Sequence, residues 1–440
     1  MLNLRYIFRL IGAFFTRFKL LILVGVGLGI IFFFLLKFLL PVFNIGQSIR
    51  IGQTGRYTVS TLPNGVLRLI GNGLTRLDSD GTVIPDLASS WETTDKGKTW
   101  TFTLKDGLTW QDGDKVTSKT INYQFSDVTI ERPNDKTIVF KLQNAYSTFP
   151  SVVSKPTFKS GLLGTGEWKV NKISLNGSIV EELNLISKDK MRASYKFFPT
   201  EERTKLAFEL GQVDRIEDIF SISPFDTWKK VEIDSLTDSG EFVAVFFDTK
   251  DSIMTEKNLR QALSYAIDKN SLGSVRAISP ISTTSWAYNP QVKPYDFDPI
   301  KAKDMIDEYK KANKMESLTI TLSTSPLLLD KAEKIADNWR ASGVEVNLQV
   351  ISTVPTEYQA FLAIFDIPED PDQYSIWHST QKSTNITHYE NPRIDKLLED
   401  GRSEIDLTVR RRVYLDFQRF LVEDSPAAFL YYPANYSVTR

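Results

Sequence analysis

The chain has 440 residues, of which 42% are hydrophobic and 12% aromatic, a composition typical of a packed globular protein. Its 53 basic and 54 acidic residues nearly balance, so its charge gives no reason to expect binding to nucleic acid. The absence of cysteine excludes disulfides, thiolate nucleophiles and cysteine-ligated metals, and two histidines leave little room for a histidine-rich metal cluster.

The first predicted element is an apolar helix at Leu20–Leu40, with the sequence LLILVGVGLGIIFFFLLKFLL. At about 1.5 Å per residue, such a helix spans roughly 30 Å, the thickness of the hydrocarbon core of a bilayer. The basic residues that precede it are Arg5, Arg9, Arg17 and Lys19. By the positive-inside rule, we expect residues 1–19 in the cytoplasm, residues 20–41 in the membrane and the rest of the chain outside.

Two alternatives for this segment are a cleaved signal peptide and a buried core helix. The apolar run exceeds the roughly 7–15 residues of a usual signal peptide core, and no A-x-A-like cleavage site follows in Leu40–Asn44. A lipid-modified anchor is excluded because the chain has no cysteine to carry the lipid. We therefore expect an uncleaved, single-pass anchor in the cytoplasmic membrane.

Strands and turns dominate the chain up to about residue 200. Ser48–Gly52 and Thr99–Leu104 alternate between apolar and polar residues, which predicts two strands that are buried on one face. Val128–Ile130 and Thr137–Leu142 predict a hairpin, and Asp78–Gly81 predicts a turn. This part of the chain is therefore expected to be rich in β-sheet.

Helices and strands alternate in the second half of the chain. After the apolar strand Phe242–Phe247, a helix is predicted whose apolar residues form one buried stripe. The residues of this stripe are Leu259, Ala262, Leu263, Ala266 and Ile267. Leu318–Leu322, a helix through Trp339 and the strand Val344–Ile351 predict a β-α-β unit with a parallel strand pair.

Several stretches, in order along the chain, resemble the motifs of one known family. They are Gly73–Trp91, Trp100–Gly113 (WTFTLKDGLTWQDG), Gly164–Val170 (GTGEWKV), Leu206–Asp214 (LAFELGQVD), Phe247–Lys269, Asp298–Met305 and Glu390–Leu398 (ENPRIDKLL). The family they resemble is family 5 of the extracellular solute-binding proteins, the oligopeptide-, dipeptide- and nickel-binding subunits of ABC importers. Each motif alone is weak evidence, and the resemblance rests on the occurrence of all of them in the same order as in the family.

The resemblance implies an α/β architecture, the two-lobed periplasmic-binding-protein fold of type II, which closes on a ligand by hinge motion. We expect the first lobe at 42–249, including a small subdomain at about 68–162, the second lobe at 250–425 and a C-terminal return to the first lobe at 426–440. Thr117–Phe125 runs almost directly into Val128, where typical members have a long helical stretch. The small subdomain is therefore expected to be trimmed.

The same resemblance points to a ligand-binding loop at Phe365–Pro371 (FDIPEDP). In peptide-binding relatives, an aspartate of the corresponding segment pairs with the α-ammonium group of the ligand through charge-assisted hydrogen bonds. Asp366 is the first candidate for this anchor and Glu369 the second, and a solvated acidic turn is the alternative. Trp286 and Trp377 are candidates for lining the cleft, and the alternative for each is packing in a core.

Catalysis is not expected, because the chain has no H-E-x-x-H or G-x-S-x-G motif and no complete P-loop. The resemblance implies a substrate-binding protein of an ABC importer that delivers a peptide or similar small solute to permease subunits. The predicted helix makes it membrane-anchored, and we expect a monomer without a cofactor. The alternative is a ligand sensor or interaction protein that keeps the binding fold without transport.

Overall fold

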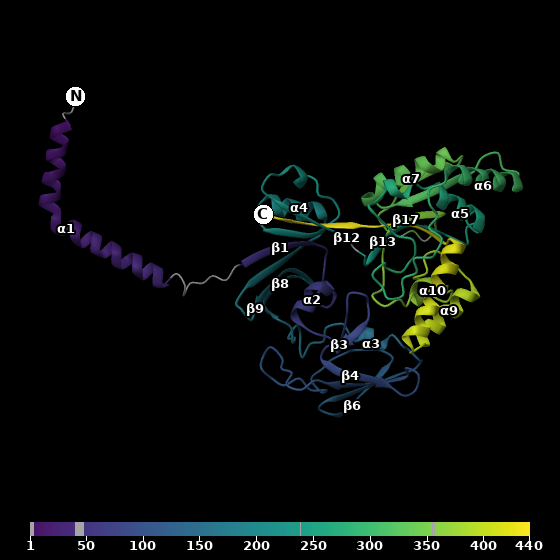
Figure 1. Cartoon of the computed structure of the whole chain (residues 1–440), viewed down its shortest axis with the longest axis horizontal. Coiled ribbons are helices and arrows are strands. Elements are labelled where there is room, and N and C mark those ends of the chain that lie inside the picture. The colour runs from purple at the N-terminus through teal and green to yellow at the C-terminus, as the bar shows by residue number, and fades with distance from the viewer. Residues whose placement is uncertain (1–3, 40–47, 238, 354, 356) are drawn as a thin grey trace.

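The computed structural model describes residues 4–39, 48–237, 239–353, 355 and 357–440. Helix α1 (Leu4–Leu39) stands apart from the folded body, which begins at strand β1 (Ser48–Thr54) (Figure 1). Within the described residues, one stretch, Thr16–Phe34, is long and apolar enough to cross a membrane, and none of it is buried. This exposure does not fit a buried core helix. Residues 40–41 of the predicted span lie outside the described residues.

The first sheet has seven strands in the order β12-β19-β11-β1-β10-β9-β8. Strand β1 lies parallel to both β10 and β11, and β8, β9 and β10 pair antiparallel in sequence. Its remaining strands are β8 (Trp168–Asn176), β9 (Ile179–Ser187), β10 (Arg192–Phe198), β11 (Arg215–Ile219), β12 (Glu232–Thr237) and β19 (Ala434–Thr439). Helix α4 (Glu201–Glu209) packs on this sheet with Phe208 fully buried.

A small β-rich subdomain is inserted between β1 and β8 (Figure 1). It combines a four-stranded sheet of order β4-β5-β7-β6 with the pair β2-β3. Its elements are α2 (Asn64–Ile70), β2 (Thr75–Leu77), β3 (Val83–Pro85), β4 (Ala88–Thr93), β5 (Thr99–Leu104), β6 (Val128–Asn134), β7 (Thr137–Leu142) and α3 (Phe149–Val152). The predicted hairpin of β6 and β7 is confirmed, as is the buried face of β5, on which Trp100, Phe102 and Leu104 are at most 4% exposed.

The second sheet has six strands in the order β14-β18-β13-β17-β15-β16, with helices packed around it (Figure 1). Its strands are β13 (Glu241–Phe247), β14 (Val275–Arg276), β15 (Thr319–Thr324), β16 (Glu345–Val350), β17 (Ala360–Asp366) and β18 (Ala427–Tyr432). The helices are α5 (Lys257–Ala266), α6 (Pro299–Ala312), α7 (Leu329–Ala341), α8 (Tyr374–Trp377), α9 (Pro392–Ser403) and α10 (Leu407–Asp424). Short 3-10 helices in the body lie at Val59–Thr61, Phe225–Thr227, Lys269–Ser271 and Pro326–Leu328.

Two local predictions for this half of the chain are confirmed. Strands β15 and β16 pair in parallel and are joined through α7, so the β-α-β unit forms as expected. All five residues of the predicted apolar stripe around α5 are 0% exposed. The stripe and the central strand β13, whose residues after Glu241 are all buried, belong to the same hydrophobic core.

Two crossing connections join the sheets, from β12 to β13 and from β18 to β19. They run alongside each other, because β12 pairs with β19 and β13 pairs with β18, both antiparallel. The ranges predicted from sequence assign β13 to the first lobe and β18 to its C-terminal return, whereas both strands pair within the six-stranded sheet. The boundaries of the two lobes remain a prediction. Limited proteolysis of the protein tests whether each lobe is a separate folding unit.

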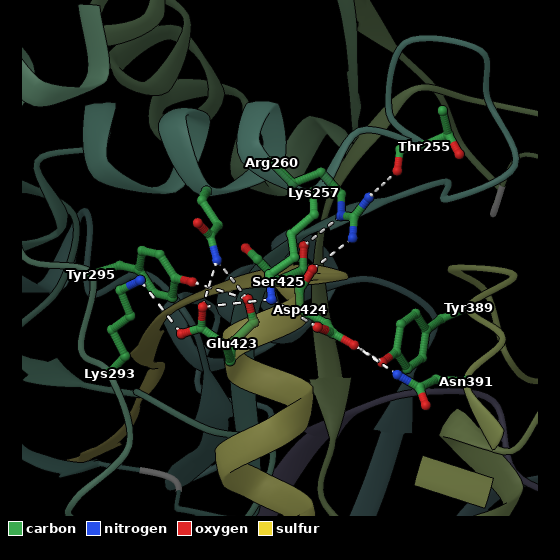
Figure 2. A network of polar contacts seen from close by, with 11 residues as sticks. Thr255, Lys257, Arg260, Lys293, Tyr295, Tyr389, Asn391, Glu423, Asp424 and Ser425 are labelled. Atoms are coloured by element: carbon green, nitrogen blue, oxygen red, sulfur yellow. Dashed lines mark hydrogen bonds and ion pairs between the residues drawn. The ribbon is translucent and has the colours of Figure 1, made fainter. Parts of the chain in front are cut away.

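The C-terminal end of α10, just before the crossing strand β18, is held by a network of polar contacts (Figure 2). Arg260 of α5 is 4% exposed and donates to the carbonyl groups of Asp424 (2.6 Å) and of the following residue (2.9 Å). The side chain of Asp424 accepts from Lys257 (3.0 Å), Tyr389 (2.5 Å) and Asn391 (2.8 Å). Cations at a helix C-terminus also complement its dipole. The start of β18 is therefore firmly tied to α5.

Ionisation of Asp424 is favoured inside this network. Burial raises the pKa of the carboxyl group, but the hydrogen bonds from Tyr389 and Lys257 outweigh burial, so its pKa lies below the ordinary value of 3.8. The contribution of the Asp424 carboxylate to stability is therefore present while the group is charged, whereas the hydrogen bonds from Arg260 to backbone carbonyls do not depend on this charge.

Candidate functional site

A cavity of about 200 Å³ lies between the small subdomain and the second sheet, and we name it the hinge cavity. The subdomain side contributes Arg68, at the end of α2, and the turn Asp78–Gly81. The crossing connection contributes Ser239 and Gly240, and the other side contributes the loop Ile367–Glu369, directly after β17. The cavity is therefore walled by both halves of the molecule and by the segment that joins them.

A second cavity of about 500 Å³ lies beside the first, and we name it the Lys155 cavity. Its own wall includes Asn64, Lys155 and Arg402, and it shares Arg68 and the loop Ile367–Glu369 with the hinge cavity. Both cavities thus belong to one cleft between the two halves.

An ion pair between Arg68 and Glu369 bridges this cleft across 301 residues of sequence. The Nη2 atom of Arg68 donates to both carboxylate oxygens of Glu369, at 2.8 and 3.0 Å. The side chains are 42% and 53% exposed, so water reaches both charges. Pairs of this kind contribute little to stability and exchange partners readily.

Backbone contacts bring the two halves together around the ion pair. The amide of Trp286 donates to the carbonyl of Asp80 (2.9 Å), and the amide and hydroxyl of Ser147 donate to the carbonyl of Arg402 (2.8 and 2.9 Å). Gly81 has a φ of +82°, and a Cβ there would lie 3.0 Å from the carbonyl oxygen of Glu369. The predicted turn at Asp78–Gly81 therefore ends at a position whose backbone conformation and close neighbour favour glycine.

The two acidic candidates from the sequence take different positions. Glu369 lines both cavities and forms the ion pair described above. Asp366 is exposed at the end of β17, opposite Glu241, and in the described part of the chain it lines neither the hinge cavity nor the Lys155 cavity. The loop is thus acidic, as expected, but the carboxylate that lines both cavities is Glu369, three residues after the first candidate.

The two tryptophan candidates also differ. Trp286 is half-buried and lines a third space of about 420 Å³, where the guanidinium carbon of Arg410 lies 5.4 Å from a ring centroid of its indole. Trp377 is 1% exposed and packs against Phe429 in the core of the second sheet. Its indole N–H donates to Gln373 (3.1 Å), a residue that does line the hinge cavity. Trp377 therefore supports the wall of the cavity from behind.

A buried ion pair fixes the loop beside Glu369. Asp370 accepts two hydrogen bonds from the guanidinium group of Arg410, one of them at 3.0 Å, and the side chains are 10% and 7% exposed. Burial lowers the pKa of Arg410, but Asp370 and Tyr414 outweigh burial and the pKa is raised overall. Arg402, which is 31% exposed, pairs with the buried Asp372 at 2.9 Å.

Sequence reasoning missed the basic residues Arg68, Arg402 and Arg410. They stand 30 to 301 residues from their acidic partners, and no motif links them to the loop. The acidic loop itself was the available signal, because buried carboxylates require a partner.

Comparisons with known proteins identify the family of the chain. The family of bacterial extracellular solute-binding proteins, family 5 (middle), matches residues 82–385. The chain belongs to this family. The resemblance stated from the motifs and the expected fold class are therefore confirmed, and the protein acts outside the cytoplasm. Because the family consists of solute-binding proteins, the prediction that this chain is not an enzyme is also confirmed.

Individual relatives of this solute-binding protein are distant in sequence. The oligopeptide-binding protein OppA of Bacillus subtilis is 23% identical, over 84% of this chain and 84% of its own. The nickel-binding periplasmic protein of Escherichia coli is 24% identical, over 82% and 83%.

Solved structures show the same fold. The Campylobacter jejuni protein NikZ in complex with Ni(L-His) has a TM-score of 0.72 at 22% identity, covering 89% of this chain and 94% of its own. The Bacillus subtilis protein AppA in complex with a nonapeptide has a TM-score of 0.67 at 19% identity, covering 90% and 95%.

Proposed function

We propose that this solute-binding protein is the membrane-anchored receptor of an ABC importer, which captures peptides or similar small solutes and delivers them to a permease. The observation that carries the proposal is the hinge cavity, whose wall comes from both halves and from the crossing segment at Ser239 and Gly240. A ligand there contacts both halves at once, which is the condition for closure driven by binding.

The chemistry of the cleft favours a ligand that carries both charges. Glu369 offers a carboxylate for an ammonium group, and Arg68 offers a guanidinium for a carboxylate. A peptide with free termini supplies both partners through charge-assisted hydrogen bonds. Relatives named for oligopeptides and dipeptides agree with this choice, and one named for nickel makes a metal chelate the competing ligand.

Within the acidic loop, the geometry leads us to expect that Glu369 contacts the ligand more closely than Asp366, because Glu369 lines the cavities. Trp286 is expected to line the neighbouring space of the cleft. Trp377 is expected to act through Gln373, to which it is hydrogen-bonded.

Thermal unfolding of the full-length protein in lipid nanodiscs tests the proposal. A defined mixture of short peptides is expected to raise Tm, since a ligand at 100 times its Kd stabilises the folded state by about 2.7 kcal/mol. Nickel–histidine and an oligosaccharide mixture serve as competing ligands. A rise in Tm with nickel–histidine alone would mean that the ligand is a metal chelate and not a peptide. No rise with any of the three ligands would contradict a role in solute capture.

The anchor is proposed from α1, whose stretch Thr16–Phe34 is apolar and exposed. N-terminal sequencing of the protein from membranes is expected to find α1 still attached, with the folded body accessible to protease outside the cell. A mature chain that begins near Asn44 would show that α1 is a signal peptide and leave the binding function intact.

The second candidate function is a ligand sensor that no longer serves transport. It is favoured by the trimmed subdomain, in which residues 105–127, all of them described, form turns and one isolated bridge in place of a helical stretch. Uptake of labelled peptide by proteoliposomes that contain this protein and its permease decides between the two, because a sensor would bind the peptide without supporting uptake.

A further inference from the structure

The hinge cavity and the Lys155 cavity share one wall. Arg68, Leu77 and the loop Ile367–Glu369 line both spaces. The ion pair between Arg68 and Glu369, at 2.8 Å, lies in this wall and closes it from the two sides of the cleft. The wall that divides the cleft into two spaces therefore includes two side chains that are held together by an ion pair.

The volumes show why this wall matters. The hinge cavity measures about 200 Å³ and the Lys155 cavity about 500 Å³. Ligand pockets of proteins commonly measure about 300–1,000 Å³, so the hinge cavity alone is small and the two spaces joined fall well within the usual range. The Lys155 cavity also shares Asn64, Lys155 and Pro156 with a surface groove of about 880 Å³ along Thr58–Leu62. Opening the wall therefore joins the hinge cavity and the Lys155 cavity into one space, which the groove borders.

The wall can open at little cost. Both side chains are long, and they are 42% and 53% exposed, so water stabilises each charge when the pair separates. A ligand that lies across the wall can also supply an ammonium or carboxylate group in place of either partner. The buried pair of Asp370 and Arg410, with side chains 10% and 7% exposed, keeps the rest of the loop in place while Glu369 moves.

We propose that Arg68 and Glu369 form a removable partition that sets ligand length. With the pair closed, a short ligand occupies one space. A longer, extended ligand must separate the pair and then lies across both spaces toward the Thr58–Leu62 groove. The proposal rests on the proposed function, since it concerns how the same cleft selects among its solutes.

The test compares two lengths of one ligand type on the full-length protein in nanodiscs. Isothermal titration gives Kd for glycine–serine peptides of two and six residues with free termini, so that only the length differs. The probe variant is Arg68→Met/Glu369→Gln, which removes both charges and keeps an unbranched side chain at each position, shorter than arginine at 68. We expect the ratio of the hexapeptide Kd to the dipeptide Kd to fall by about two- to fivefold, the range for breaking an exposed pair.

Two further variants separate the partition from general effects of charge. Arg68→Glu/Glu369→Arg rebuilds the pair with reversed polarity and is expected to return the ratio toward the wild-type value. Lys303→Met/Asp307→Asn removes a similarly exposed pair on α6 (3.3 Å; side chains 55% and 48% exposed), together with the contact of Asp307 to Lys310, and is expected to leave the ratio unchanged.

Each outcome decides something specific. An unchanged ratio in the Arg68/Glu369 probe variant, with wild-type protein that binds peptides, overturns the partition and leaves the proposed function standing. The same change in the α6 variant also overturns it. Wild-type protein that binds neither peptide overturns the partition, and the proposed function falls with it if the peptide mixture, nickel–histidine and the oligosaccharides also leave Tm unchanged.

Discussion

Glu369 and Asp370 are neighbours in one loop, yet their carboxylates lie in opposite environments. Asp370 pairs with Arg410 inside the second half of the molecule, where the side chains are 10% and 7% exposed. Glu369 pairs with Arg68 across the cleft, where they are 53% and 42% exposed. The same chemistry therefore has two uses. A buried pair fixes a loop because neither charge tolerates isolation, and an exposed pair can be exchanged because water or a ligand replaces the partner.

The largest expected effect comes from breaking the buried pair. Arg410→Met leaves Asp370 as an uncompensated buried charge and is expected to lower the free energy of unfolding by about 3–5 kcal/mol. Chemical denaturation of the full-length protein measures it. Adding Asp370→Asn to this variant is expected to recover part of the loss, because the isolated charge is removed. A loss below about 1 kcal/mol would show that this pair behaves like an exposed one.

An intermediate effect is expected at Asp424, whose side chain is 24% exposed. Asp424→Asn removes the charge that accepts from Lys257 and Tyr389, and a loss of about 1.5–3 kcal/mol at pH 7 is expected for hydrogen bonds to a charged group. The native pKa of Asp424 is lowered from 3.8, so the unfolded chain takes up the proton first as the pH falls. Its contribution is therefore complete well above pH 3.8 and is lost as the pH falls through the native pKa.

The measurement for Asp424 is the difference in unfolding free energy between wild type and Asp424→Asn, followed from pH 7 to pH 3. The two stabilities are expected to converge toward acid pH. A difference that stays constant with pH would show that the charge of Asp424 does not contribute, and the contrast between buried and exposed acidic groups would then need another cause.

The smallest effect is expected at the exposed pair. Arg68→Met is expected to change the free energy of unfolding by less than about 1 kcal/mol, because both side chains remain solvated. Denaturation at low and high salt measures it, and salt should reduce the already small effect. A loss above about 2 kcal/mol would mean that the contact across the cleft is a structural bond, which would also weaken the case for an exchangeable partition.

Local patterns in the sequence were sufficient for much of the fold. The alternation in Thr99–Leu104 and the stripe around Leu259–Ile267 predict buried faces, since side-chain direction repeats with the backbone geometry of strand and helix. The order of the motifs along the chain was sufficient to predict the family. Both kinds of information are carried by residues close together in sequence.

The layout of the cleft depended on tertiary structure. Asp366 and Glu369 are both acidic residues in the sequence, and the folded loop after β17 places Glu369 beside Arg68, 301 residues away. Trp286 and Trp377 are likewise the same residue type, yet Trp377 is buried behind Gln373. Periodicity reports which face of an element is apolar, whereas the pairing of surfaces distant in sequence follows from how the sheets, helices and crossing strands pack together. The sequence by itself thus determined the architecture and the family, and the packing of the two halves decided which side chains meet in the cleft.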